Sequence, residues 1–202
     1  MTHPRYKALI FDMDGTLTRP ALDFRLIRQE IGRDIEGDLA HGIEALPPAE
    51  QARAWAIIEA HEERAMREQE LQSGAEGLVR ECRRRNVKVG VVTRNLRRSV
   101  DHLCARYGIE FDAVLTREFP HLKPDPAPVL HMLRQWGLAP ADTLVVGDYL
   151  HDIDCGRAAG ADTCFFQNPG QPFFGENADY LVNSMAELRP IVLGDNRKGD
   201  NE

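Results

Sequence analysis

The chain has 202 residues and a formal net charge of −7, with 43% hydrophobic and 28% charged residues. The balance is ordinary for a folded globular protein, and the length suits one substantial domain with a small insertion. The acidic charge argues against sequence-independent nucleic-acid binding, and no apolar run approaches the ~18 residues of a membrane span. The first seven residues lack an apolar signal segment, so we expect a cytoplasmic protein.

The first apolar run of the chain ends in two acids. Leu9–Phe11 is too short for a helix and is typical of a buried strand, and Gly15 indicates a turn after it. Asp12 and Asp14 are two residues apart on an extended chain, so their side chains point the same way. Converging carboxylates repel each other unless a cation lies between them or one is protonated. On these residues alone, a turn that uses Asp and Gly only for its backbone shape explains the pattern equally well.

Residues 18–72 differ in character from the rest of the chain. They are rich in acids and arginines, lack lysine, and place apolar residues at helical spacing over Leu22–Ile31 and again after Pro47 and Pro48. We predict an all-helical insertion of roughly 55 residues, which is too small for a typical independent domain.

Regular alternation of strands and helices begins near Gly74. The predicted strands are 87–93, 113–116, 143–148, 163–166 and a short one at 180–182, and the predicted helices are 75–85, 97–107, 126–136, 152–159 and 185–193. This alternation predicts right-handed crossovers and a parallel α/β sheet with helices on both faces. We therefore predict a Rossmann-like α/β core over residues 1–17 and 73–194, with 195–202 as a flexible tail.

The cysteines are scattered, and no two of them form a Cys-x-x-Cys pair. A disulfide framework or a thiolate metal site is therefore not expected. We interpret all four, Cys82, Cys104, Cys155 and Cys164, as small core residues.

Polar residues gather at one edge of the predicted sheet. Parallel strands point the same way, so residues that follow them share the edge at which ligands bind. Asp12, Asp14, Thr93 and Asp148 lie on this edge. Clustered carboxylates suit Mg²⁺, a threonine hydroxyl can donate to a phosphate oxygen, and a carboxylate can act as a nucleophile. Together with Lys123, a scarce residue type in this chain, these groups suit phosphoryl transfer, because a dianionic phosphate must be neutralised before a carboxylate can attack it.

Four motifs now carry a resemblance. They are Phe11-Asp12-Met13-Asp14-Gly15-Thr16-Leu17, Val91-Val92-Thr93-Arg94-Asn95, Leu122-Lys123-Pro124-Asp125-Pro126 and Val146-Gly147-Asp148-Tyr149-Leu150-His151-Asp152. In this order they resemble the haloacid dehalogenase-like hydrolase superfamily, and within it the phosphoglycolate-phosphatase-like branch. The insertion at 18–72 sits where this branch carries a small helical cap that closes over the site and helps to select the substrate.

The resemblance implies a role for each motif residue. Asp12 is expected to be the nucleophile, and Asp14 the general acid and base that also offers its backbone carbonyl to Mg²⁺. Asp148 is expected to bind the metal directly, and Asp152 directly or through water.

The remaining expected site residues bind the phosphoryl group. These are Thr93, Lys123 and Asn95, although a helix cap for the segment from Arg97 explains Asn95 equally well. The implied activity is Mg²⁺-dependent hydrolysis of a small phosphorylated metabolite through an aspartyl-phosphate on Asp12.

Single residues argue for or against other activities that are known on the same core. Asp14 argues against a dehalogenase, which lacks the second acid, and the absence of lysine from the insertion argues against a phosphonate hydrolase, which needs one for a Schiff base. A sugar phosphomutase, which uses the same core, stays open. A non-catalytic module that binds a partner through the acidic insertion is disfavoured by the presence of Asp12, Asp14 and Lys123.

Overall fold

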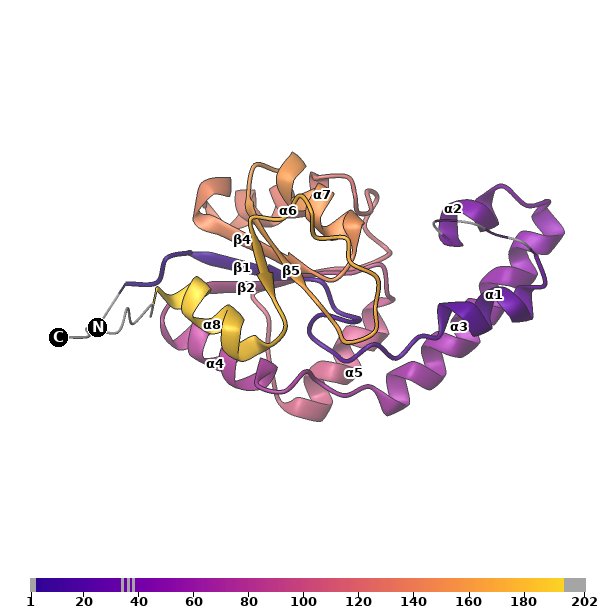
Figure 1. Ribbon diagram of the computed structural model, residues 1–202, viewed down its shortest axis with the longest axis horizontal. Coiled ribbons are helices and arrows are strands. Elements are labelled where there is room, and N and C mark those ends of the chain that lie inside the picture. The colour runs from indigo at the N-terminus through magenta and orange to yellow at the C-terminus, as the bar shows by residue number, and fades with distance from the viewer. Residues whose placement is uncertain (1–2, 34, 36, 38, 195–202) are drawn as a thin grey trace. The chain divides into compact units, whose positions relative to one another are not determined.

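The computed structural model describes residues 3–33, 35, 37 and 39–194 (Figure 1). These residues divide into two compact units. The larger unit comprises the described residues up to Pro20 and those from Glu70 onward, and the smaller unit those from Ala21 to Gln69. The tail predicted at 195–202 lies outside the described residues. Within the described part of the chain, no helix combines the length and apolar character needed to cross a bilayer.

A six-stranded parallel sheet forms the centre of the larger unit, in the order β3-β2-β1-β4-β5-β6. The strands are β1 (Ala8–Phe11), β2 (Lys88–Val92), β3 (Ala113–Leu115), β4 (Thr143–Gly147), β5 (Asp162–Phe166) and β6 (Tyr180–Val182). β1 pairs with β2 on one side and β4 on the other, with Phe11 in register with Val91 and Val146. The predicted Rossmann-like α/β core is thus confirmed.

Helices cover both faces of this sheet (Figure 1). One face carries α4 (Ala75–Arg84), α5 (Arg97–Tyr107) and α8 (Met185–Leu193), and the other carries α6 (Ala127–Trp136) and α7 (Leu150–Ala158). The side chains of β1 point alternately to these two faces of the sheet. Leu9 and Phe11 pack toward α4, α5 and α8, while Ala8 and Ile10 pack toward α6 and α7, and all four side chains are fully buried.

The cysteines are unpaired and lie in the core, as expected. Cys82, Cys155 and Cys164 are buried and Cys104 is half-buried. Burial raises the pKa of the Cys155 thiol to about 12, so this thiol stays protonated, and it donates to the Asp125 carbonyl at 3.1 Å.

The smaller unit consists of helices α1 (Phe24–Ile31), α2 (Leu39–Glu44) and α3 (Pro48–Glu68). The carboxylate of Asp23 caps α1 by accepting from the backbone N–H of Arg25 and Leu26. Ile27, Ile43, Ala54 and Ile58 are among the side chains that form its core. α1 and α3 correspond to the two predicted helical stretches, whereas α2 was not predicted, because six residues that include a glycine carry no readable apolar period.

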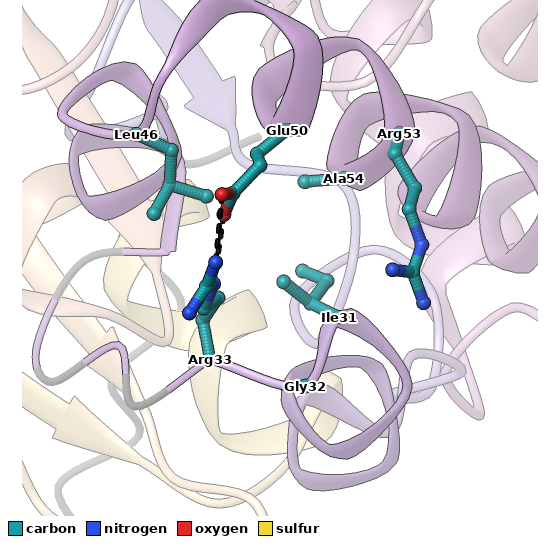
Figure 2. Close-up of a pocket in the computed structure, with 7 residues that line it drawn as sticks. All are labelled: Ile31, Gly32, Arg33, Leu46, Glu50, Arg53 and Ala54. Atoms are coloured by element: carbon teal, nitrogen blue, oxygen red, sulfur yellow. Dashed lines mark hydrogen bonds and ion pairs between the residues drawn. The ribbon is translucent and has the colours of Figure 1, made fainter.

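A small cavity of about 280 Å³ opens between α1 and α3 within this unit (Figure 2). Its polar wall is an ion pair in which the Arg33 guanidinium donates to both oxygens of Glu50, at 2.7 and 2.6 Å. Ile31, Leu46 and Ala54 provide the apolar wall. Since Glu50 already neutralises Arg33, the cavity offers no free charge from this pair.

Two segments of the larger unit run side by side where the insertion leaves and returns. Thr18 and Leu71 form an isolated antiparallel bridge. The Arg19 N–H donates to the Glu70 carbonyl at 2.9 Å, and the N–H of Gln72 donates to the carbonyl of Leu17 at 2.8 Å. The larger unit is therefore closed by its own backbone hydrogen bonds at this junction.

Candidate active site

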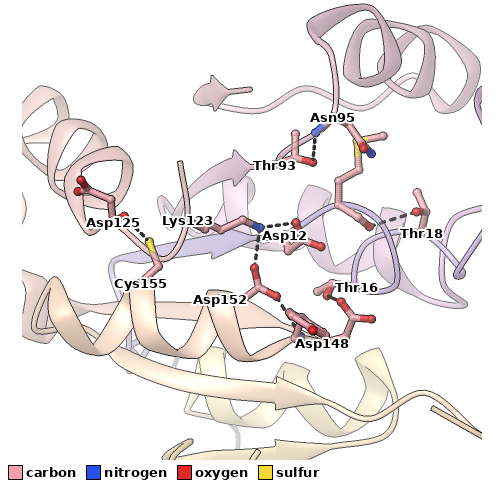
Figure 3. Close-up of polar contacts among 12 residues, drawn as sticks. Asp12, Thr16, Thr18, Thr93, Asn95, Lys123, Asp125, Asp148, Asp152 and Cys155 are labelled. Atoms are coloured by element: carbon pink, nitrogen blue, oxygen red, sulfur yellow. Dashed lines mark hydrogen bonds and ion pairs between the residues drawn. The ribbon is translucent and has the colours of Figure 1, made fainter. Parts of the chain in front are cut away.

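Three adjacent strands deliver polar residues to one point. Asp12, Thr93 and Asp148 each directly follow the last residue of β1, β2 and β4. The N–H of Asp12 still donates to the Val146 carbonyl of β4 at 2.9 Å. Because the register of the parallel sheet aligns these strand ends, the three side chains gather at the carboxyl edge predicted from the sequence (Figure 3).

Lys123 reaches this edge from the loop before α6 and contacts two acids. Its Nζ lies 2.5 Å from Asp12 Oδ1 and 2.5 Å from Asp152 Oδ1. The lysine side chain is only 5% exposed, and those of Asp12 and Asp152 are 12% and 4% exposed. A buried ammonium with two carboxylate partners is held in one place, since each broken contact would leave a desolvated charge.

Asp152 has a second role in the same place. Its Oδ2 accepts from the N–H of Tyr149 at 3.1 Å, which caps the first turn of α7. Asp152 therefore stabilises the start of α7 and belongs to the acidic cluster at the same time. Gly147 makes room for it, since a Cβ there would lie 2.1 Å from Asp152 Cβ.

The electrostatics of the cluster are dominated by burial and by like charges. Burial raises the pKa of Asp12 to about 6, with Lys123 lowering it and Asp152 raising it. Burial and the neighbouring charges of Asp12, Asp152 and Asp14 raise the pKa of Asp148 to about 8. For Lys123, burial opposes the charged form, but Asp12 and Asp152 outweigh it and raise the pKa. Without a further cation, Asp148 is thus crowded enough by its acidic neighbours to retain its proton near neutral pH.

The chemistry of the cluster fits a divalent cation. Asp12, Asp148 and Asp152 each offer an oxygen, and these atoms all lie within 4.8 Å of one another. Carboxylate oxygens are the ligands that Mg²⁺ prefers, and a cation would relieve the repulsion that raises the pKa of Asp148. The side chain of Asp14 is not part of this group. Its expected contribution to the metal is the backbone carbonyl, and that stays a prediction.

The turn after β1 is shaped around Asp148. Gly15 adopts a φ of +84°, and a Cβ on it would lie 2.1 Å from Asp148 Oδ2. A side chain is therefore excluded both by the backbone conformation and by the carboxylate. The Asp-Gly turn signal predicted a turn here, and its position against Asp148 adds a steric reason for the glycine.

Thr93 and Asn95 lie in the turn that follows β2. Thr93 is buried, and its Oγ1 accepts from the N–H of Asn95 at 3.1 Å. Figure 3 shows this turn beside Asp12, on the side away from Asp148 and Asp152. Asn95 does not cap α5, because the N-cap is Leu96 and Glu118 Oε1 accepts from the N–H of Arg97. The helix-cap alternative for Asn95 is therefore wrong, and its phosphate-binding role stays a prediction.

Two polar residues that contact Asp148 were not identified from the sequence. Thr16 Oγ1 donates to Asp148 Oδ1 at 3.4 Å, and Asn168 Nδ2 donates to Asp148 Oδ2 at 3.4 Å. Asn168 comes two residues after β5, which ends at the same edge as β1 and β4. Its place after a predicted strand is the signal that could have found it.

Comparison with known proteins finds relatives that match most of this chain. The model of a family described as haloacid dehalogenase-like hydrolase matches residues 25–166. One relative, from Arabidopsis thaliana, is a haloacid dehalogenase-like hydrolase domain-containing protein. It is 32% identical to this chain, and the match covers 93% of this chain and 84% of the relative's length. A phosphoglycolate phosphatase of Thiobacillus denitrificans is 29% identical over 92% of this chain and 95% of its own.

The fold has solved counterparts as well. The crystal structure of a predicted phosphoglycolate phosphatase from Haemophilus somnus matches with a TM-score of 0.73. The match covers 91% of this chain and 96% of the other at 20% identity, so the likeness is one of fold.

Proposed function

The chain belongs to the haloacid dehalogenase-like hydrolase family, and on that premise we propose that it is a Mg²⁺-dependent phosphatase acting on a small phosphorylated metabolite. The observation that carries this proposal is the contact of Lys123 Nζ with Asp12 and Asp152, beside the carboxylate of Asp148. One ammonium group and two further carboxylates lie beside Asp12, which supports the proposal that Asp12 is the nucleophile.

Asp12 is proposed as the nucleophile. Above a pH of about 6 its carboxylate is ionised, and Lys123 holds one of its oxygens, Oδ1. An oxygen of Asp12 attacks phosphorus, the bond from phosphorus to the ester oxygen breaks, and an aspartyl-phosphate forms. The second step is attack of water on phosphorus, which releases inorganic phosphate and restores the Asp12 carboxylate.

The other residues supply protons and positive charge. Asp14 gives its proton to the departing ester oxygen and then takes one from the attacking water. Lys123 and the hydroxyl of Thr93 bind phosphoryl oxygens, with Asn95 beside them. Asp12, Asp148 and the Asp14 carbonyl are the proposed metal ligands, with Asp152 acting through water, because Lys123 and the Tyr149 N–H engage its two oxygens. When bound, Mg²⁺ supplies positive charge that offsets repulsion between the carboxylate and the phosphate.

The proposal also covers the cell compartment of the protein and the role of the smaller unit. Four unpaired cysteines in the core suit a reducing compartment, so we propose a cytoplasmic location. The division of the chain into a core over 1–17 and 73–194 and a helical cap over 18–72 is likewise proposed, with the cap assigned to substrate selection.

The test is hydrolysis of p-nitrophenyl phosphate by the purified chain with Mg²⁺ and with EDTA. We expect turnover only with Mg²⁺, and none from Asp12→Asn. Asp142→Asn is the matched control, because Asp142 pairs with exposed Lys7 away from the site and its loss leaves the mechanism intact. A wild type that is silent with this substrate and with a panel of phosphorylated sugars, acids and nucleotides refutes the proposal and favours a binding module.

A phosphomutase is separated by its product. Hydrolysis releases inorganic phosphate in step with substrate loss, whereas a mutase returns an isomeric phosphate ester and releases almost none. Release of phosphate at the rate of substrate loss is the expected result.

A further inference from the structure

Asn168 connects three segments that are far apart in the sequence. It follows β5, is only 4% exposed, and uses both ends of its side-chain amide. Nδ2 donates to the carbonyl of Gly15 at 2.6 Å and to Asp148 Oδ2 at 3.4 Å. Oδ1 accepts from Nε2 of Gln72 at 2.9 Å. One side chain thus contacts the turn after β1, the acid after β4 and the segment that leads into α4.

The chemistry of these partners fixes which way the amide points. The Gly15 carbonyl and the Asp148 carboxylate are acceptors, so the NH₂ group must face them. Turning the amide over would place Oδ1 against two acceptor oxygens and would leave the Gln72 amide donor without its acceptor. Each buried polar atom left without a partner destabilises the fold, because nothing then compensates for its removal from water. The hydrogen bond from Gln72 therefore keeps the Asn168 amide in the orientation in which its NH₂ group donates to Asp148.

Asp148 is held from two sides by neutral donors. Thr16 Oγ1 donates to Oδ1, and Asn168 Nδ2 donates to Oδ2, each at 3.4 Å. Gly15 lies directly against the same Oδ2 and leaves no space for a Cβ. The direction of this carboxylate is thus set by hydrogen bonds on both oxygens and by contact with the backbone.

From this geometry we propose that Asn168 is a positioning residue, which orients Asp148 for binding of Mg²⁺ while Gln72 orients Asn168. The inference rests on the proposed function, because it assigns Asp148 to the metal. Asn168 itself does not touch the substrate or the reacting atoms. Outer groups that orient metal ligands typically change metal affinity by about 10–100-fold when they are removed.

A purely structural role for Asn168 makes a different prediction. If the side chain only satisfied the Gly15 carbonyl, its loss would lower the free energy of unfolding and leave the affinity for Mg²⁺ unchanged. If it orients Asp148, the dissociation constant for Mg²⁺ rises, and turnover recovers when the Mg²⁺ concentration is raised. These two outcomes are separated by measuring binding and unfolding on the same variants.

The experiment measures the Mg²⁺ dissociation constant by isothermal titration calorimetry, without substrate, for the full chain. We expect Asn168→Ala to raise this constant about 10–100-fold, and Gln72→Ala to raise it less. In the double variant the Gln72 effect should vanish, because Gln72 acts through Asn168. Asn183→Ala is the control. Asn183 donates to Glu187 beyond β6, so its loss should leave Mg²⁺ binding unchanged.

Gln72→Glu gives a sharper test of the orientation. A carboxylate at this position cannot donate to Asn168 Oδ1, so it favours the turned amide, and we expect weaker Mg²⁺ binding than in Gln72→Ala. This variant changes a half-buried residue and serves if Asn168→Ala fails to fold.

The outcomes are distinguishable. Equal Mg²⁺ affinity in wild type, Asn168→Ala and Gln72→Glu overturns the positioning role and leaves the proposed phosphatase standing. A wild type that does not bind Mg²⁺ overturns the metal site and, with it, the proposed function.

Discussion

Lys123→Met tests whether the buried lysine is the counter-charge on which the cluster depends. Methionine keeps the apolar length of the side chain and removes the ammonium. Asp12 and Asp152 would then be buried within a cluster that also contains Asp148, with no cation among them. We expect a large loss of stability at pH 8 in EDTA, where the Asp12 carboxylate is ionised.

The magnitude follows from burial. Removing one partner of a buried ion pair typically costs about 3–5 kcal/mol, because the other charge stays desolvated and unpaired. Lys7 offers the matched comparison. Its Nζ lies 2.9 Å from Asp142, but the two side chains are 63% and 35% exposed. Exposed pairs contribute about 0–1 kcal/mol, so Lys7→Met should be at least about 2 kcal/mol less harmful than Lys123→Met.

The assay is urea unfolding of wild type, Lys123→Met and Lys7→Met in EDTA, repeated with saturating Mg²⁺. Mg²⁺ should recover part of the loss in Lys123→Met, because it supplies positive charge to the same carboxylates. Adding Asp152→Asn to Lys123→Met should recover part of it without metal, since one buried charge is then removed. Equal free energies of unfolding for the two lysine variants would refute the reasoning.

Three further predictions follow from the site. The pKa of Asp148 is raised from 3.8 to about 8, so its stabilising contribution is complete in acid and is lost as the pH rises to about 8. Stability in EDTA should therefore fall by about 1.4 kcal/mol per pH unit over pH 6.5–7.5, above the raised pKa of Asp12, and Asp148→Asn should lack this slope in urea unfolding. Gly15→Ala should lower the thermal unfolding temperature more than Gly137→Ala does. Both glycines have positive φ, but only at Gly15 would a Cβ meet a carboxylate. Equal losses in the two variants would contradict this contact. Asp14→Asn should slow p-nitrophenyl phosphate turnover at least about 100-fold with little change in the Mg²⁺ dissociation constant measured by calorimetry, and near-normal turnover would exclude Asp14 as the acid and base.

Much of the arrangement was predictable because it depends on strand ends. A buried strand that stops in an acid places that acid at the carboxyl edge of a parallel sheet, which is how Asp12 and Asp148 were predicted to lie together. Lys123 was predicted to join them, through the family resemblance and the scarcity of lysine in the chain. The expected family and enzyme class, a haloacid dehalogenase-like phosphatase, are confirmed by the comparisons.

The unpredicted parts depend on contacts that no local pattern encodes. Asn168 donates to the Gly15 carbonyl, which lies 153 positions away in the chain. Its residue type is common in loops, so only the fold shows what its amide contacts. For Asp14, the spacing predicted a side chain that converges with that of Asp12, and the group of metal-type oxygens formed by Asp12, Asp148 and Asp152 does not include it. The role of Asp14 stays a prediction.

Backbone contacts within the larger unit hold the two ends of the insertion next to each other. Thr18 bridges Leu71 and Arg19 binds Glu70, so the ends of the insertion are already neighbours before any of it folds. Lengthening a loop whose ends are fixed adds only about 0.6 kcal/mol per doubling of its length. We therefore expect that helical modules of other lengths can be grafted at this junction with little loss of stability in the larger unit.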